Sequence, residues 1–500
     1  MNLSHAFAST ADNQGRKTAV FWGDQEYSYE LLLAQSRFLA GLLYGQFGVK
    51  PGDRVGLWLK NCPEFIPALY AVLQLGAVVV PINNFLKPDE IQHILNDAGI
   101  NVLITDAATE EHLPAVAALR PGLKSWPVES FARPDVAAAT LKAAAPNVAE
   151  PSAHDLALII YTSGTTGRSK GAMLTHGNLM HNVESCRQVL AAVDHDRFAV
   201  LLPMFHSFML TVGVLLPLTV GGSLVLIRSL HPPKNILQDI YQRQATILPA
   251  VPSLFRTLAS VPLPPGLPLR ICISGGAPLP LEILRDFNLK MPLPLIEGYG
   301  LSEASPVVSL NPLQGPRKEG SIGKPIPGVE VSVQDDSGNL LPVGATGEIC
   351  VRGGNVMRGY WNQPEATATT LRAGWLLTGD LGHRDSDGFF YISDRKKDML
   401  IVNGINVYPR EIEEVLYQFP GVREAAVVGM PDARRGEQPI AFVAPKEGTS
   451  LEEKSILQFV RQKLADYKVP KRVTFLPALP RNATGKVLKT ALRQTPSVSP

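Results

Sequence analysis

The chain has 500 residues, a formal net charge of +2 and a hydrophobic fraction of 45%. This length predicts more than one domain with ample buried core. The nearly balanced charge gives no reason to expect a nucleic-acid partner. Cys62, Cys186, Cys272 and Cys350 are scattered without a C-x-x-C pair, which is typical of free thiols in a reducing cytosol rather than of disulfides or a zinc site.

The N-terminal segment has no apolar run of the kind found in signal peptides, which favours a cytoplasmic protein. Residues 198–227 contain no Asp, Glu, Lys or Arg, so a hydropathy window would mark them as a membrane span. His206, Pro217 and a glycine pair argue against a span. We predict a helix over 210–220, a glycine turn and a buried strand over 223–227, all in a soluble core that lines an apolar pocket.

Residues 1–160 alternate helical and strand-like runs. The run YELLLAQSRFLAGLLYGQF (29–47) has helical spacing, whereas DRVGLWL (53–59) and GAVVVPI (76–82) have the composition of buried strands. Such alternation predicts a doubly wound α/β layer.

A loop of unusual composition follows at residues 162–171, TSGTTGRSKG. The apolar run 156–162 predicts a strand before it and 174–190 a helix after it, so we expect the loop between a strand and a helix. Glycines let backbone N–H groups turn inward, hydroxyl side chains add donors, and a lysine adds a mobile charge, a combination that binds anions. We predict a polyphosphate site with these contacts: Thr162, Ser163, Gly164, Thr165, Thr166, Gly167 and Lys170.

Three other interpretations of this loop are weaker. A flexible linker of Gly, Ser and Thr is not usually held between a buried strand and a helix. A Walker A motif needs a different spacing of its glycines and lysine. The segment GRSKG satisfies G-x-S-x-G, but Ser169 would lie between two cations, which does not suit a hydrolase nucleophile.

Residues 161–320 continue the α/β style, with strands predicted at 198–203, 223–229, 245–251 and 269–275. Short β runs separated by turn pairs between 320 and 393 predict an antiparallel barrel or meander. After the basic cluster SDRKKD, a small α+β domain follows, with helices at 408–419 and 451–467 and strands at 424–430 and 440–445. Residues 394–500 carry 18 Lys and Arg against 12 Asp and Glu, a net +6 that suits an anionic partner.

Six ordered motifs together resemble the adenylate-forming (ANL) superfamily, which comprises acyl-CoA synthetases, adenylation domains and firefly-type luciferases. The resemblance covers nearly the whole chain, and the ordered set is far more specific than any motif alone. The motifs are TSGTTGRSKG (162–171), SGGAPL (274–279), EGYGLSEASP (297–306), GEICVRGGNVMRGYWNQPEAT (347–367), LLTGDLGHRDSDGFFYISDRKKDMLIVNGINVYPREIEE (376–414) and PRNATGK (480–486).

The resemblance implies a large N-terminal domain, residues 1–393, with two doubly wound α/β subdomains and a β-barrel. A hinge at 394–397, with Lys397 as its hinge residue, would connect it to a small mobile C-terminal α+β domain, residues 398–500. The implied substrates are ATP with Mg²⁺, a small-molecule carboxylic acid and coenzyme A. The acid attacks the α-phosphorus of ATP, and a thiol then takes the acyl group. The oligomeric state stays open, a homodimer included.

Lys486 is the residue expected to bring the attacking carboxylate and the α-phosphate together, since a flexible ammonium can approach both. Ser302 and Glu303 occupy the Thr-Glu pair of the family. The hydroxyl would contact the α-phosphate, and the carboxylate would bind Mg²⁺, a hard cation that prefers oxygen ligands.

Tyr299 and Gly300 belong to the same motif, and Tyr299 would stack on adenine. Asp380 would accept hydrogen bonds from the ribose hydroxyls, and Arg395 would reach the ribose or a phosphate. The base would be walled by Gly275, Gly276, Ala277 and Pro278.

The implied acyl site is apolar. His206 and Val307 would line it, together with Phe205, Phe208 and Val308. A core histidine is an equally good interpretation of His206. Gly404 would face the pantetheine channel after the C-terminal domain rotates. Asn406 stands at a position where several relatives carry arginine, and the fatty-acyl-type members resemble this sequence in having asparagine there.

We therefore predict an acyl-CoA synthetase that activates a fatty or related apolar acid. Two alternatives stay open: a ligase that loads a phosphopantetheinyl carrier protein, and a nucleotide- or lipid-binding protein without catalysis. Luciferase-like oxidation uses the same scaffold.

Overall fold

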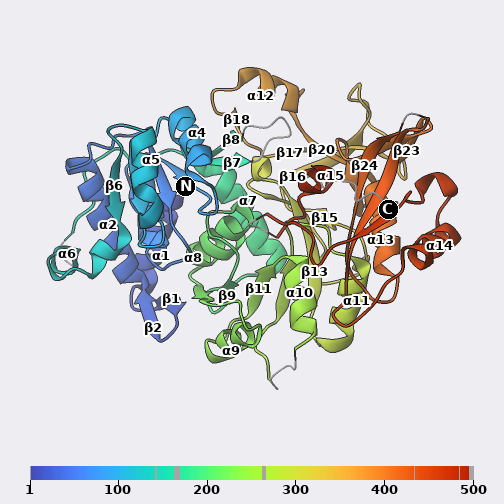
Figure 1. Cartoon of the computed structure of the whole chain (residues 1–500). Helices are drawn as coiled ribbons and strands as arrows, with labels where there is room; N and C mark the ends of the chain where they lie inside the picture. Colours follow the sequence, from blue (N-terminus) through green and yellow to red (C-terminus); the bar gives the residue numbers. More distant parts are fainter. Residues whose placement is uncertain are drawn as a thin grey trace.

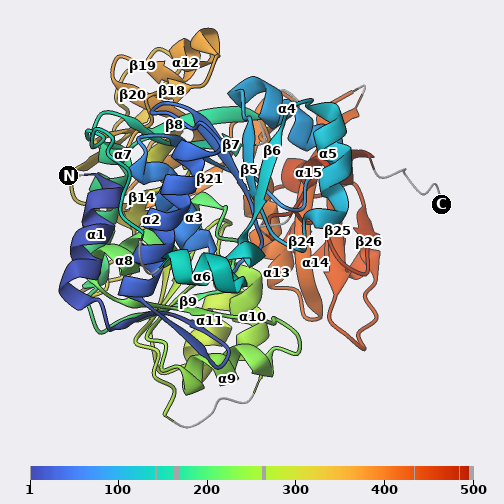
Figure 2. The same ribbon diagram turned by 90° about the vertical axis from the view of Figure 1, so that its left-hand side faces the viewer.

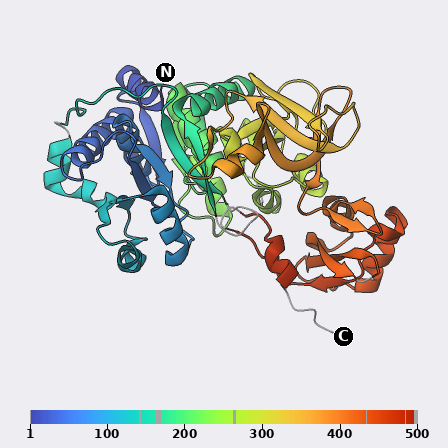
Figure 3. The same ribbon diagram turned by 90° about the horizontal axis from the view of Figure 1, so that it is seen from above.

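The structure is a computed structural model, and it describes residues 2–140, 143–162, 169–261, 266–432, 434–482 and 485–494. Three sheets form an N-terminal body, and a fourth sheet forms a C-terminal domain (Figure 1). Seen from above, the C-terminal domain is a separate lobe beside the body (Figure 3). The predicted fold class, two α/β units with a β-barrel element and a small α+β domain, is confirmed.

The first α/β sheet has seven strands in the order β18-β8-β7-β4-β3-β5-β6. Strands β7, β4, β3, β5 and β6 run parallel, as the βα alternation predicts. Their bounds are Arg54–Trp58 for β3, Val78–Pro81 for β4, Val102–Thr105 for β5, Lys124–Pro127 for β6, Leu156–Thr162 for β7, Lys170–Thr175 for β8 and Gly359–Tyr360 for β18.

The second sheet has nine strands in the order β15-β14-β13-β12-β11-β9-β10-β1-β2. Its strands are β1 (Thr18–Trp22), β2 (Gln25–Ser28), β9 (Arg197–Val200), β10 (Ser223–Leu226), β11 (Ile247–Ala250), β12 (Ile271–Ser274), β13 (Leu295–Gly300), β14 (Val307–Leu310) and β15 (Lys324–Pro325).

The two α/β units exchange strands, which the sequence did not predict. The N-terminal strand β1 pairs parallel with β10 in the second sheet, with Val20 opposite Leu224. Strands β7 and β8 belong to the first sheet, although they follow its N-terminal part by many residues. Local patterns predict where strands lie but not which distant strand each one joins.

Helices cover the faces of both sheets, and Figure 2 shows α1, α2 and α3 together on one side of the body. The buried side chains of α1, α2 and α3 pack into one large apolar core, whereas those of α4 and α5 and those of α9, α10 and α11 belong to two further clusters. The body helices are α1 (Leu3–Gln14), α2 (Tyr29–Gly45), α3 (Phe65–Gln74), α4 (Pro88–Ala98), α5 (Leu113–Leu119), α6 (Pro134–Thr140), α7 (His176–Leu190), α8 (Leu216–Val220), α9 (Lys234–Gln242), α10 (Pro252–Ala259) and α11 (Leu281–Lys290).

The loop at 162–171 lies between two antiparallel strands, so the prediction of a strand followed directly by a helix was wrong. Strand β8 pairs with β7, with Thr162 opposite Lys170. Only after β8 does α7 begin, where the Thr175 hydroxyl accepts a hydrogen bond from the Asn178 N–H at 3.0 Å. The short apolar run after Lys170 is a strand because it continues the ladder of β7.

The uncharged segment 198–227 is core, as predicted. It contains β9, a π-helical turn over Met209–Leu215, α8 and β10. The π-helical turn was not predicted; within it Gly213 leaves room for the Met209 side chain, because a Cβ there would overlap the Met209 sulfur. Among the described residues, no helix is long and apolar enough to cross a membrane.

The third body sheet is antiparallel, as predicted for residues 320–393, and runs β16-β17-β20-β19 with β21 on β20. Its strands are β16 (Val329–Gln334), β17 (Gly347–Gly353), β19 (Leu371–Arg372), β20 (Trp375–Arg384) and β21 (Phe390–Arg395), and α12 (Pro364–Thr370) lies beside it.

The C-terminal domain begins after a turn that follows β21. Its sheet runs β23-β22-β25-β24, with β26 on β25, and helices pack on it around a separate apolar core. Its elements are β22 (Leu400–Val402), β23 (Ile405–Val407), α13 (Pro409–Tyr417), β24 (Val422–Asp432), β25 (Gly436–Pro445), α14 (Glu453–Lys463), β26 (Val473–Phe475) and α15 (Lys489–Gln494).

Candidate active site

A cavity of about 1960 Å³ lies where the body sheets and the C-terminal domain meet. Strands β12 and β13 are parallel neighbours, so their carboxyl ends open at the same edge of the sheet. Gly275 and Gly276 follow β12, and Tyr299 and Gly300 end β13, all four lining the cavity. Ligands of open α/β sheets bind at such an edge.

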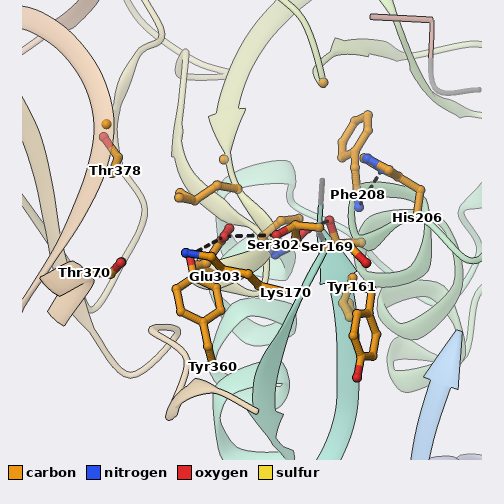
Figure 4. Close-up of a pocket in the computed structure, with 18 of the residues that line it drawn as sticks. Tyr161, Ser169, Lys170, His206, Phe208, Ser302, Glu303, Tyr360, Thr370 and Thr378 are labelled. Carbon is orange, nitrogen blue, oxygen red and sulfur yellow. Dashed lines mark hydrogen bonds between the residues drawn. The ribbon is translucent and has the colours of Figure 1, made fainter. Parts of the chain in front are cut away.

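Ser302 and Glu303 lie on a single 3₁₀ turn, Ser302–Ala304, directly after β13. The Glu303 Oε1 accepts a hydrogen bond from the Tyr360 hydroxyl at 2.9 Å and a long one from the Thr162 hydroxyl at 3.5 Å (Figure 4). The Ser302 hydroxyl lies 3.0 Å from the Ser207 hydroxyl. The predicted pair therefore faces the strand that leads into the loop at 162–171.

Lys170 begins β8, and its ammonium lies over the Tyr360 ring, 5.2 Å from the ring centroid. Figure 4 shows Lys170, Glu303 and Tyr360 gathered in one part of the cavity. Thr162 and Lys170, at the two ends of the predicted loop, both line the cavity. The other predicted loop contacts lie outside the described residues: Ser163, Gly164, Thr165, Thr166 and Gly167.

Tyr299, Asp380 and Arg395 form a polar group in which Asp380 is buried and the other two side chains are half-buried. The Asp380 Oδ2 accepts a hydrogen bond from the Tyr299 hydroxyl at 2.6 Å, and its Oδ1 lies 3.0 Å from the Arg395 Nε. Burial, together with the Asp380 charge, raises the pKa of Tyr299 well above its usual value, so its hydroxyl stays protonated. Each carboxylate oxygen has two acceptor positions, so Asp380 keeps capacity for further hydroxyl donors.

Lys486 reaches this cavity from the C-terminal domain. Its backbone N–H donates to the Asn482 side-chain oxygen at 2.9 Å. Burial lowers the pKa of Lys486 to about 8, and the neighbouring Arg395 charge lowers it in the same direction, whereas Asp380 opposes them. The ammonium therefore lies among the residues predicted to hold a nucleotide.

His206 lies beside the Lys486 ammonium. Burial, and then the Lys486 charge, lower the pKa of His206 to about 4, so the imidazole is neutral near pH 7. Its Nδ1 accepts a hydrogen bond from the Phe208 N–H at 3.4 Å, which leaves the proton on Nε2.

One part of the cavity wall is apolar. Phe208 packs against Gly275, where an added Cβ would lie 3.0 Å from the ring. The predicted acyl residue Val307 is in this wall. The apolar wall consists of Cys186, Leu190, Phe208, Val212, Ile273, Val307 and Leu310.

Several predicted residues do not line the cavity. Ala277 and Pro278 follow Gly276 along the chain but are not among its lining residues. Asp380, which is 3% exposed, is not among them either, although Gly379 and Arg395 are. Lys397 lies in the turn between β21 and β22, which is where the hinge was predicted. Gly404, with a φ of +78°, is at the exposed turn between β22 and β23, away from the cavity.

Sequence reasoning missed Tyr360, Ser207 and Thr378, all of which line the cavity. Tyr360 lies within the motif 347–367, but nothing in the local sequence shows that its hydroxyl meets a carboxylate. It also missed Glu297, which is 5% exposed and accepts a hydrogen bond from the Leu279 N–H at 3.0 Å. Burial raises the pKa of Glu297 to about 7.

The chain matches the AMP-binding enzyme family over residues 7–361 and the C-terminal domain of AMP-binding enzymes over residues 411–486. It belongs to this family, which is the superfamily that the motifs resemble. Neither match reaches residues 394–397, so the predicted hinge and domain bounds stay predictions.

Its relatives match over nearly their whole length. A feruloyl-CoA synthase of Amycolatopsis sp is 40% identical over 486 residues, covering 95% of this chain and 95% of the relative. A long-chain-fatty-acid–CoA ligase of Bacillus subtilis (strain 168) is 36% identical over 514 residues, covering 95% of this chain and 91% of the relative.

Among solved structures, ATP-bound MatB from Rhodopseudomonas palustris superposes with a TM-score of 0.91 at 34% identity, covering 99% of each chain. With the family, these relatives define the chain as an AMP-forming acyl-CoA ligase, an enzyme. ATP and CoA are the substrates of that class. The acids named for the relatives differ, so the family does not define the acid.

Proposed function

We propose that this enzyme activates a monocarboxylic acid with an apolar body, a fatty or related acid, through acyl-AMP and transfers the acyl group to CoA. The observation that carries the proposal is one cavity that joins Lys170, Glu303 and Lys486 to the apolar wall. None of the residues of that wall is charged. An acid with a second ionised carboxylate would lose its hydration there without gaining a partner.

Four polar side chains in or beside the cavity have roles in this proposal. The carboxylate of the acid is already a nucleophile, so the first step needs alignment and charge neutralisation more than proton transfer. Lys486 would approach the attacking oxygen and the α-phosphate. The neutral His206, through its Nε2–H, would donate to the acid without adding a charge. Asp380 would hold the ribose hydroxyls, and Tyr299 would stack on the base.

Mg²⁺ fits this site as an ion that enters with ATP. Among the residues that the structure describes, no group of three or more His, Cys, Asp or Glu side chains converges as a metal cluster does. Glu303 lies in the cavity next to the phosphate-loop lysine and has no ion-pair partner within the described ranges. Mg²⁺ commonly takes one or two carboxylates together with substrate phosphates and water. Glu303 would be that ligand and would help to neutralise phosphate charge.

The second step needs CoA to reach the acyl-adenylate. Lys486, together with Asn482 and Leu488, lines the cavity from the C-terminal domain in this structure, while Gly404 faces solvent. We propose that rotation at residues 394–397 removes Lys486 and brings Gly404 to the pantetheine channel. Hinges of this kind are a few residues that absorb the backbone change.

The test is incubation with ATP, Mg²⁺ and CoA across a panel of straight-chain C4 to C16 acids and ferulate. We expect pyrophosphate release and acyl-CoA formation with at least one apolar acid. Absence of pyrophosphate release with every acid would contradict the proposal. A planar aromatic acid is the second candidate, because the feruloyl-CoA synthase is the more identical of the two relatives described. The kcat/KM values measured across the panel show whether a straight-chain or a planar aromatic acid is the better substrate.

The thiol acceptor is tested in the same assay. We expect free CoA to give more thioester than a phosphopantetheinyl carrier protein at equal concentration. The reverse order would make this chain a carrier-loading ligase with the same adenylation step.

A further inference from the structure

We propose that Tyr360 is a positioning residue that keeps the phosphate-loop lysine, Lys170, and the carboxylate of Glu303 apart, so that the first stays available for phosphate and the second for metal. The inference rests on the proposed function of this cavity. Tyr360 contacts both opposite charges at once, one through its hydroxyl and one through its ring.

The hydroxyl contact fixes the carboxylate. The Tyr360 hydroxyl donates to the Glu303 Oε1 at 2.9 Å. A phenol hydroxyl is a hydrogen-bond donor, so it suits a carboxylate acceptor. A hydrogen bond to an ionised acceptor is about twice as strong as one between neutral groups. One carboxylate oxygen is thereby held in place, and the other is left for a ligand.

The ring contact holds the cation. The Lys170 ammonium is 5.2 Å from the centroid of the Tyr360 ring, within the range of a cation–π interaction. At a partly exposed site such a contact is modest in strength. An incoming phosphate can therefore draw the lysine away from the ring, and no carboxylate is needed to hold the lysine there.

The backbone of Tyr360 is itself anchored. Strand β18 pairs with β8, with Tyr360 opposite Ala172, two residues after Lys170. The Tyr360 N–H donates to the Thr367 hydroxyl of α12 at 2.8 Å. The ring therefore has a fixed place beside the strand that carries the lysine, as a positioning residue requires.

The two charges attract each other, and without the ring they would be free to close into an ion pair. Within the described residues, neither Lys170 nor Glu303 takes part in an ion pair, although both are half-buried and both contact Tyr360. A direct Lys170–Glu303 pair would consume the charge that each needs for its ligand. Because the phenol offers a donor to the anion and a π face to the cation, it satisfies both without joining them.

The test compares dissociation constants of free ATP in EDTA and of Mg·ATP, measured by calorimetry with no acid present. Tyr360→Phe keeps the ring and removes the donor, so we expect Mg·ATP to bind about tenfold more weakly. Free ATP should bind within about twofold of wild type, because Lys170 keeps its ring contact. Tyr360→Leu removes both contacts, and we expect both constants to rise.

Tyr161→Phe is the matched control. The Tyr161 hydroxyl also donates to a carboxylate in this cavity, Asp97 at 2.5 Å, but Tyr161 contacts neither Lys170 nor Glu303 in any hydrogen bond or ring contact of the described residues. Both constants should stay at the wild-type values. The midpoint of thermal unfolding, measured on every variant, shows whether each one folds.

Glu303→Gln separates this inference from the proposed function. If Glu303→Gln weakens Mg·ATP and Tyr360→Phe does not, Glu303 binds metal but the role of Tyr360 is wrong. If Tyr360→Phe weakens free ATP and Mg·ATP equally, the effect is general damage and the inference is also wrong. If neither variant changes Mg·ATP binding, both the metal assignment and the inference fail.

Discussion

Lys486 is the residue whose chemistry depends most on where the structure places it. It comes from the C-terminal domain, yet it lies beside His206, Arg395 and Asp380 of the body. Burial lowers its pKa to about 8. An ammonium with such a pKa is still charged at pH 7 but loses its proton within the alkaline range in which the enzyme can be assayed.

We predict a descending alkaline limb in the adenylation rate. The kcat/KM for ATP reports the free enzyme, so it should fall as pH rises through about 8, because neutral Lys486 no longer offsets phosphate charge. In the pH dependence of kcat, the descending limb should lie at higher pH, since the phosphates of bound ATP favour the charged form of Lys486.

The measurement is pyrophosphate release against pH between 6.5 and 10. Lys486→Arg should be slower but should lack the descending limb, because arginine keeps its charge. An unchanged limb in Lys486→Arg would mean that another group titrates.

At the scale of single residues, the sequence motifs predicted the charged residues of the site but not the contacts between them. Tyr299 was assigned to the base, Asp380 to the ribose and Arg395 to the ribose or a phosphate, and the structure joins them through one hydrogen bond and one ion pair. Tyr360 went unnoticed because its partner, Glu303, is 57 residues away along the chain. Such pairs follow from tertiary packing, which local patterns do not contain.

At the scale of elements, the site depends on how strand β13 turns into the 3₁₀ segment that carries Ser302 and Glu303. The Leu301 N–H donates to the Pro306 carbonyl at 3.0 Å, and β13 pairs with β14 through Gly300 and Val307. A Cβ at Gly300 would overlap that same Pro306 carbonyl oxygen. The glycine is therefore needed for close backbone approach.

Gly300→Ala should force β13 and β14 apart. We expect a loss of about 3 kcal/mol in stability and a fall of roughly 5 °C in the thermal midpoint, together with slower adenylation. Gly41→Ala, in the middle of α2 with no atom within 4 Å of the new Cβ, should be neutral or slightly stabilising. Calorimetry of both variants checks this, and equal midpoints would show that the strands give way without cost.

Most strands of the body could be predicted from apolar runs, with β7 at its predicted bounds of 156–162. The element after the loop at 162–171 could not be predicted in this way. Strand β8 is short and lies directly before a helix, so helical spacing from 174 onward concealed it. Its identity as a strand comes from pairing with β7, a contact across the loop.

At the scale of the whole molecule, the body and the C-terminal domain meet around buried charges. The buried carboxyl of Glu297 lies in the body, and the nearby charges of Arg410 and Glu414 come from α13 of the C-terminal domain. The Leu281 N–H of α11 donates to the Glu414 carboxylate at 3.4 Å. The sequence predicted two domains but could not show that their interface places a carboxyl out of water.

The stability of the protein should therefore fall as pH rises through this carboxyl's titration. Burial raises the folded-state pKa of Glu297 to about 7 from a usual 4.5, so its contribution is full below 4.5 and is lost as pH rises to about 7. The loss is on the order of 3 kcal/mol.

Glu297→Gln is neutral at every pH, so the thermal midpoint of the variant minus that of wild type should increase from pH 5 to pH 8. Scanning calorimetry at the two pH values measures this difference. A difference that stays constant with pH would show that Glu297 does not carry the effect.

The central claim is that Lys486 of the C-terminal domain completes the adenylation site and is not needed once the adenylate exists. Its most direct measurement is the two half-reactions of Lys486→Ala, assayed separately. We predict that adenylate formation from acid and ATP falls by at least about a hundredfold, while thioester formation from supplied acyl-AMP and CoA stays within about threefold of wild type. If both half-reactions fall together, or if adenylate formation is unchanged, the proposed role of Lys486 is wrong.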